Sequence, residues 1–110
     1  MTISISRGPA WIEPNYLIQF ACIVSSSSFT EAARETGVSK STLSRMVTML
    51  EEYVGMPLLE RTTRRVNATD AGHTLYNQCL EVYAAWLAAR ETIGTIKREA
   101  VDGSTGQTTK

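Results

Sequence analysis

Basic and hydroxyl side chains gather in one short stretch of the chain, residues 39–45, which contains no acid. Its polar members are Ser39, Lys40, Ser41, Thr42, Ser44 and Arg45. Long basic side chains donate hydrogen bonds to phosphates and to guanine edges, and small hydroxyl residues let a helix approach a groove closely. A solvated helix face usually mixes both signs of charge. This stretch does not, so it predicts a surface that contacts double-stranded DNA.

A second basic cluster lies between residues 61 and 65, again without an acid. We expect it to form the polar tip of a short hairpin that reaches the neighbouring minor groove or backbone, with contacts from Arg61, Thr62, Arg64 and Arg65. Two hydroxyl residues before the first cluster, Ser28 and Thr30, complete the expected DNA contacts. The sequence shows no nucleophile with a base and an orienting group, so an enzyme is not predicted. No metal site or cofactor is predicted either.

Three helices are expected to position the first cluster. Helical periodicity from residue 15 predicts a first helix with Asn15 as its N-cap, and the four serines at residues 25–28 predict a plain loop. Thr30 is expected to cap a second helix that ends at Gly37. Ser39 is expected to cap a third helix, which runs to about residue 54 and stops at Gly55.

The spacing around Gly37 is typical of a helix-turn-helix. Ala33 offers the small residue needed where two helices cross, and Gly37 offers a positive φ for the turn. Val38 is expected to fill the core beneath the turn, while Leu43 and Met46 face inward. Any αα-hairpin shares this spacing, so that alternative stays open on spacing alone.

The hairpin and one more helix complete a mainly α fold. Thr69 is expected to cap a proline-free helix that runs to about residue 98 and carries a heptad-like apolar stripe. A small domain cannot cover both sides of such a helix, so the stripe predicts a homodimer interface formed by Cys79, Val82, Trp86, Ala89, Ile93 and Ile96. The alternative is a helix folded back on its own domain. The expected order is therefore an irregular leader (1–14), a winged helix-turn-helix (15–68), a dimerisation helix (69–99) and a disordered tail (100–110).

The overall composition is compatible with a small DNA-binding domain but does not by itself indicate one. The chain has 110 residues, 43% of them hydrophobic, and its 11 basic residues equal its 11 acidic residues. A nucleic-acid partner is therefore indicated by the distribution of charge and not by its sum. Two cysteines without a CxxC pair suit a reducing cytoplasm. The sequence predicts no membrane span and no signal peptide.

The chain resembles the LysR-type transcriptional regulators. The resemblance rests on Leu17-x-x-Phe20, Ser28-Phe29-Thr30-x-Ala32-Ala33, Val38-Ser39-Lys40-Ser41-Thr42-Leu43-Ser44-Arg45, Leu50-Glu51, Gly55-x-Pro57-Leu58-Leu59-x-Arg61 and Thr69-x-Ala71-Gly72. It implies a winged helix-turn-helix that binds DNA as a homodimer through the long fourth helix. It also implies DNA contacts from the start of the third helix, including Ser44 and Arg45, and from the wing arginine Arg61.

The sequence departs from the family pattern at a few positions. Lys40 stands where the family commonly has glutamine. Glutamine pairs well with adenine, whereas lysine prefers guanine or a phosphate, so the change alters the expected base preference. Thr36, Leu59 and Ala68 stand at core-type positions where larger residues are usual. Family members also carry a sensor domain, and no strand pattern follows the fourth helix, so we expect no small-molecule effector site in this chain.

These features predict a sequence-specific DNA-binding regulator that acts as a homodimer in the cytoplasm, associated with the nucleoid. An alternative is an interaction module that heterodimerises with a full-length relative and modulates it. The two hypotheses differ in whether the homodimer alone binds DNA tightly.

Overall fold

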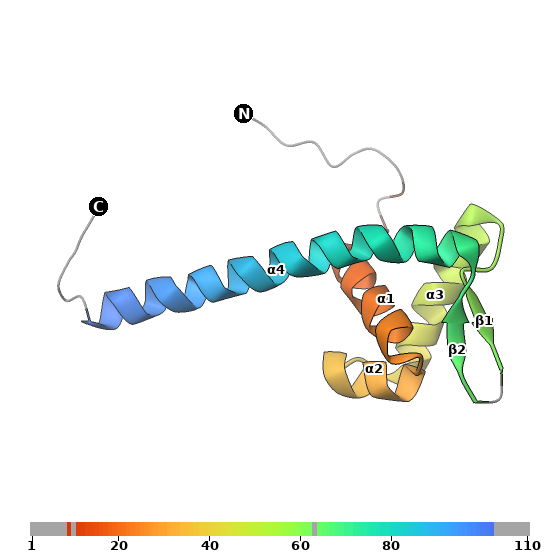
Figure 1. Ribbon diagram of the computed structural model, residues 1–110, viewed down its shortest axis with the longest axis horizontal. Coiled ribbons are helices and arrows are strands. Elements are labelled where there is room, and N and C mark those ends of the chain that lie inside the picture. The colour runs from red at the N-terminus through yellow and green to blue at the C-terminus, as the bar shows by residue number, and fades with distance from the viewer. Residues whose placement is uncertain (1–8, 10, 63, 103–110) are drawn as a thin grey trace.

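The computed structural model describes residues 9, 11–62 and 64–102, which form a small head and one long helix that leaves it (Figure 1). The elements are α1 (Pro14–Ser26), α2 (Phe29–Thr36), α3 (Lys40–Val54), β1 (Leu59–Arg61), β2 (Val66–Ala68) and α4 (Asp70–Asp102). The prediction of a mainly α winged helix-turn-helix followed by a long helix is therefore confirmed.

The beginning of α1 differs from its prediction. The helix starts at Pro14, and its N-cap is Glu13, whose side chain makes no capping hydrogen bond. Asn15 as the cap is therefore wrong. Proline suits the first helical position, because its fixed φ is already helical and the N–H it lacks would have had no partner there.

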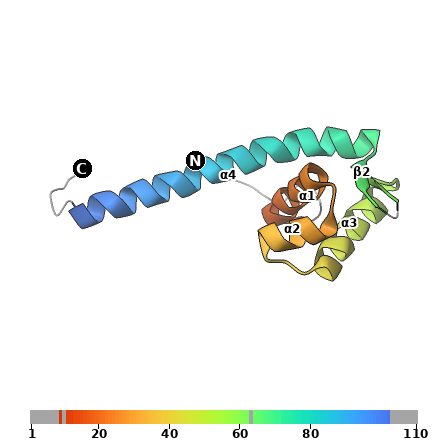
Figure 2. The same ribbon diagram turned by 60° about the horizontal axis from the view of Figure 1, so that its bottom comes forward.

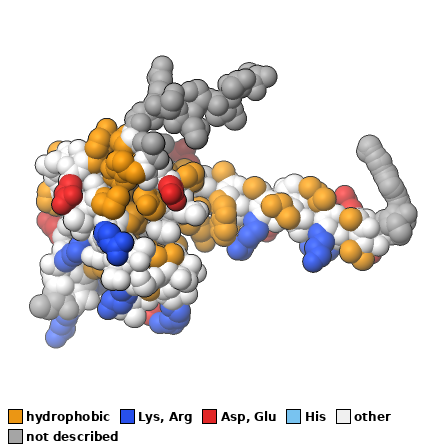
Figure 3. Space-filling model, turned by 180° about the vertical axis from the view of Figure 1, so that it is seen from behind, with side chains coloured by type: hydrophobic (Ala, Val, Ile, Leu, Met, Phe, Trp, Pro, Cys, Tyr) orange, Lys and Arg blue, Asp and Glu red, His pale blue; other side chains and the backbone are white. Residues whose placement is uncertain are grey.

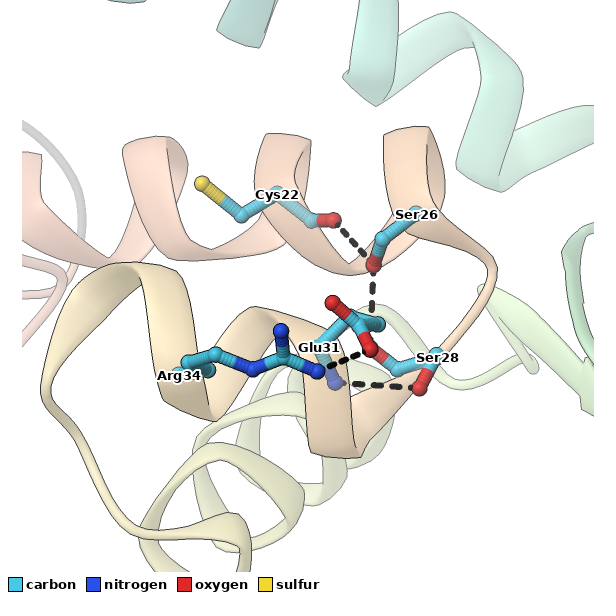
Figure 4. Close-up of polar contacts among 5 residues, drawn as sticks. All are labelled: Cys22, Ser26, Ser28, Glu31 and Arg34. Carbon is cyan, nitrogen blue, oxygen red and sulfur yellow. Dashed lines mark hydrogen bonds and ion pairs between the residues drawn. The ribbon is translucent and has the colours of Figure 1, made fainter.

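The four serines are not a plain loop. Ser26 ends α1, and its Oγ donates to the carbonyl oxygens of Cys22 (2.8 Å) and Ser28 (3.0 Å). Ser27 adopts the left-handed conformation at φ 57°. Ser28 caps α2 by accepting from the N–H of Glu31 at 3.0 Å (Figure 4). Thr30 as the cap is thus wrong, because the cap lies two residues earlier and Thr30 falls in the first turn of α2.

The ends of α2 and α3 agree with the predictions. Gly37 (φ 76°) and Gly55 (φ 81°) end the two helices in the left-handed conformation, where a side chain would be strained. Ser39 caps α3, and its Oγ accepts from the N–H of Thr42 at 3.2 Å. These local signals set the turn between α2 and α3.

The core lies where α1, α3 and the first turns of α4 meet. Its largest fully buried side chains are Phe20, Ile23, Leu43, Val47 and Cys79. The small residue that is fully buried in α2 is Ala32, whereas Ala33 is only partly buried against the core. The prediction that Leu43 and Met46 face inward is confirmed.

The two strands form an antiparallel hairpin in which Leu59 pairs with Ala68 and Arg61 pairs with Val66. Leu59 and Val66 point into the core, which anchors the base of the hairpin. The N–H of Val66 also donates to the carbonyl of Ser27 at 3.2 Å, so β2 is joined to the turn between α1 and α2.

The long helix α4 divides into two halves with different surroundings (Figure 2). We call residues 70–87 the packed half and residues 88–102 the free half. The packed half lies along α1 and buries Gly72 and Cys79. In the free half every residue except Gly94 is exposed.

Two predictions about α4 need correction. Cys79 has no exposed surface in the single chain, so it belongs to the core of the head and not to a dimer interface. Residues 100–102, predicted as part of a disordered tail, are the last residues of the helix. Residues 1–8 and 10 of the predicted leader, and residues 103–110 of the predicted tail, lie outside the described residues.

Candidate nucleic-acid interface

The first turn of α3 presents a connected set of hydroxyl groups. Ser39 Oγ donates to Thr42 Oγ1 at 2.9 Å and lies 3.3 Å from Ser41 Oγ. All three residues are exposed, as are Lys40 and Arg45. The hydroxyls are thus held in fixed positions while the two bases extend into solvent, which is an arrangement suited to bases and phosphates.

Arg61 joins the hairpin to both helices of the helix-turn-helix. Its guanidinium carbon lies 4.9 Å from the centre of the Phe29 ring, at the first residue of α2. Its Nη1 lies 3.5 Å from Ser44 Oγ on α3. A cation held over an aromatic face loses conformational freedom, so Arg61 is placed before any ligand arrives.

The tip of the hairpin is organised by Thr62. Its N–H donates to the carbonyl of Arg65 at 2.9 Å, and its Oγ1 accepts from the N–H groups of Arg64 (3.3 Å) and Arg65 (3.0 Å). The hydroxyl that was predicted to face DNA is therefore used within the turn. The side chains of Arg64 and Arg65 are exposed.

The start of α2 lies at the same end of the head. Ser28 is half-buried and occupied as the N-cap, and Thr30 is exposed. Arg34 pairs with Glu31 on the exposed side of α2 (Figure 4). Of the two predicted contact residues, only Thr30 presents its side chain to solvent.

The basic side chains gather on one side of the head. In Figure 1, α2 and the tip of the hairpin lie at the lower side of the head, away from α4. From behind, Lys and Arg side chains gather on that lower side, whereas apolar side chains are prominent above them (Figure 3). Together with the contacts of Arg61 to Phe29 and Ser44, this arrangement brings the basic residues of α3 and of the hairpin to one side of the head.

Three residues to which the sequence assigned no role in the site hold the parts of the head together. Phe29 carries Arg61. Glu51, on α3, accepts hydrogen bonds through Oε2 from the N–H groups of Leu58 (2.8 Å) and Leu59 (3.1 Å). Gly72 lies against the carbonyl of Leu58. All three belong to the motifs that carry the family resemblance, and this was the only signal in the sequence that could have pointed to them.

The two thiols have the properties of packed side chains. Burial raises the pKa of Cys79 to about 11, and burial together with the nearby Glu35 carboxylate raises the pKa of Cys22. Within the part of the chain that the structure describes, no group of His, Cys, Asp and Glu could hold a metal ion. The described helices include none with the length and apolarity to cross a membrane.

The family model of the bacterial regulatory helix-turn-helix proteins, lysR family, matches residues 14–73. The chain is 38% identical over 87 residues to the HTH-type transcriptional regulator BudR of Klebsiella aerogenes, covering 79% of this chain and 61% of that protein. It is also 38% identical over 79 residues to the probable HTH-type transcriptional regulator LtrA of Klebsiella pneumoniae, covering 72% of this chain and 26% of that protein. These relatives are transcriptional regulators and not enzymes.

Among solved structures, the chain is similar to a crystal structure of the BenM DNA-binding domain with catB site 1 DNA. The TM-score is 0.64 and the identity 31%, with 88% of this chain and 100% of that chain covered. The full length of that isolated DNA-binding domain is thus matched by this chain. In contrast, the chain spans less than two thirds of the length of each of the two regulators named above.

Proposed function

Because the chain belongs to the LysR family of bacterial regulatory helix-turn-helix proteins, we propose that it binds a two-fold symmetric DNA site as a homodimer and so regulates transcription. The matched residues form the DNA-binding domain of a LysR-type transcriptional regulator. The observation that carries the proposal is the acid-free, exposed start of α3, with Arg61 held beside it by Phe29 and Ser44.

In this proposal the first turns of α3 enter the major groove. Arg45 contacts a base edge or a buried phosphate, and Lys40 contacts guanine O6 and N7 or a phosphate. The hydroxyl residues Ser39, Ser41 and Thr42 approach the backbone closely because their side chains are short. Ser28 and Thr30 lie at the start of α2, from which Thr30 reaches a phosphate.

The wing contacts the backbone or the minor groove beside the α3 site. Arg64 and Arg65 extend from the turn that Thr62 organises, so they supply charge that attracts any DNA sequence. Arg61 is closer to α3, and its fixed position supports a more specific contact. The wing and α3 together therefore combine general attraction with selective contacts.

A second copy of the chain is the partner proposed for the free half of α4. Ile93, Ile96 and Val101 are 67%, 59% and 71% exposed there, and a group of large exposed apolar side chains marks an interaction surface. One winged helix-turn-helix touches too few base pairs to select a site in a genome. A symmetric pair doubles the contacts, and the proposed interface contains Val82, Trp86, Ala89, Ile93 and Ile96.

A groove of about 470 Å³ between α1, α2 and α4 supports the same partner. Trp86 forms part of its wall, stacked on Tyr83 with ring centres 6.1 Å apart and covered by Arg90 at 4.6 Å. Gln19 Oε1 is buried beside it without a hydrogen-bond partner among the described residues. We expect the free half of a second α4 to cover this groove and to satisfy that oxygen.

Selection of bound fragments from random DNA, with this protein alone, tests the proposal. The expected result is enrichment of two-fold symmetric sequences whose half-sites are separated by about one helical turn or more. A protein that enriches no sequence alone, but does so when mixed with a longer relative, would favour the heterodimerising module instead. A fluorescent fusion that fails to co-localise with the bacterial nucleoid would contradict the expected nucleoid association.

A further inference from the structure

The segment between α3 and the hairpin, residues 57–59, is held by both α3 and α4. From α3, the Glu51 carboxylate accepts from the N–H groups of Leu58 and Leu59. From the start of α4, Thr69 Oγ1 donates to the Pro57 carbonyl at 2.9 Å, and the Thr69 N–H donates to the Leu58 carbonyl at 3.0 Å. Leu58 itself is buried. This segment is therefore a joint between α3 and α4.

Gly72 makes the joint tight. A Cβ added there would lie 2.0 Å from the Leu58 carbonyl oxygen and 3.2 Å from the Ala68 Cβ. The first of these is a backbone atom, so no side-chain rotation relieves the overlap. Its φ is not one that requires glycine. The close approach of α4 to the joint is therefore the reason why this position has no side chain.

The length of α4 magnifies small changes at the joint. The 23 residues that follow Cys79 in α4 span on the order of 35 Å, so a tilt of about 5° about Cys79 moves the far end of the helix by roughly 3 Å. That displacement is close to the rise of one base pair, about 3.4 Å. The packing of Cys79 and its neighbours on α1 lies between the joint and the free half, and it supplies the point about which the helix would tilt.

From these contacts we infer that Gly72, with Glu51, sets the direction of α4 relative to α3 and thereby the half-site spacing that the protein accepts. The inference rests on the proposed homodimer, because only a pair of heads has a spacing to choose. Neither residue contacts DNA in this account. Both are positioning residues: Gly72 permits the close approach, and Glu51 fixes the joint to α3.

The test uses a set of DNA duplexes with two half-sites at stepped separations, and a duplex with one half-site. Gly72→Ala is expected to shift the preferred separation by at least about one base pair. Its affinity for the single half-site should change by less than about twofold, as for an independent site. Glu51→Gln should broaden the range of accepted separations, because an amide holds the two N–H groups less strongly than a carboxylate.

The matched control is Gly94→Ala, since its added Cβ would lie 3.7 Å from Arg98 Nη1, an ordinary contact. It should retain the wild-type separation. Circular dichroism and sedimentation are used to check that each variant is folded and dimeric. If Gly72→Ala does not fold, the separation profile of Glu51→Gln tests the inference by itself.

Two results would overturn the inference, and they are distinguishable. Folded, dimeric variants with the wild-type separation profile would overturn the role of the joint alone. A wild-type protein that sediments as a monomer and shows no preferred separation would overturn the homodimer, and the joint with it.

Discussion

The packed half and the free half of α4 continue one apolar repeat, but they differ in what covers it. In the packed half, Gly72 and Cys79 are buried against the head. Two heptads after Cys79, Ile93 and the neighbouring Ile96 are more than half exposed. The helix itself does not change, since the hydrogen-bonded spiral runs unbroken to Asp102. The difference lies entirely in which surface is available to each half.

This comparison shows that a heptad repeat predicts an apolar face and not the partner that covers it. The sequence pattern assigned Cys79 and Ile93 to one interface, although the first serves folding and the second remains available for association. The head reaches along α4 only as far as the first turns of α1, where Asn15 lines one groove with Trp86 and Arg90. Where α4 passes beyond the head depends on how the helices pack, so the heptad repeat alone does not predict it.

The largest effect should come from a charge in the packed half. Cys79→Asp places a carboxylate where the side chain has no exposed surface, and an unpaired buried charge costs several kcal/mol, a large part of a small domain's stability. We expect the head to lose its cooperative thermal transition. A variant that melts as the wild type does would show that the packed half is not part of the core.

A charge in the free half should leave the head folded. Ile93→Glu puts a charge on an exposed position, so the thermal transition of the head should move little, whereas dimerisation should weaken by a few kcal/mol. Light scattering and DNA binding report the loss of the pair. Thr92→Glu is a control on the same turn at an exposed polar position. If both variants remain dimers, the free half is not the interface.

Changes in the head should alter DNA contacts without altering association. Arg45→Ala should cost about 1–3 kcal/mol of binding at the preferred site and relax base preference there. Arg64→Ala should weaken binding evenly across sequences and reduce the salt dependence by about one phosphate contact. Fluorescence anisotropy at several salt concentrations measures both. Equal losses on specific and random DNA for Arg45→Ala would contradict its assigned role.

The smallest effect concerns the two thiols, which report on packing directly. The thiolate is the reactive form, and burial raises the pKa of Cys79 to about 11. Near pH 8, native Cys79 should therefore react with iodoacetamide more slowly than Cys22, which is only partly buried, and both should react at similar rates in denaturant. Mass spectrometry of the labelled peptides resolves the two sites. Faster labelling of Cys79 would mean that the packed half opens readily.

Local signals in the sequence were sufficient for the helix-turn-helix. Gly37, Ser39 and Gly55 end or begin helices through contacts within a few residues, so their roles were predictable. The run of serines was harder, because every serine in it can cap a helix, and the choice of Ser28 depends on Ser27 adopting a positive φ. Asn15 was predicted as the first cap because asparagine is a common N-cap residue, whereas Pro14 already occupies the first helical position and Glu13 precedes it as the cap.

Contacts between distant elements were beyond sequence reasoning. Glu51 accepts hydrogen bonds from the segment before β1 because the chain turns back after α3. Gly72 lies against the Leu58 carbonyl because α4 then packs beside that segment. Arg61 was predicted as a wing residue, but its position over Phe29 requires the hairpin to lie against α2. The types of these residues could be read from the sequence. Their partners depend on how the elements pack.

The central claim is that the free half of α4 pairs two copies of this chain, and sedimentation equilibrium tests it most directly. On the order of tens of micromolar, where interfaces of micromolar affinity or better are populated, we expect a mass of about 24 kDa, twice the 12.1 kDa of one chain. The same species should bind one two-fold symmetric DNA duplex. A protein that remains at 12.1 kDa under these conditions, yet binds such a duplex tightly, would contradict the account.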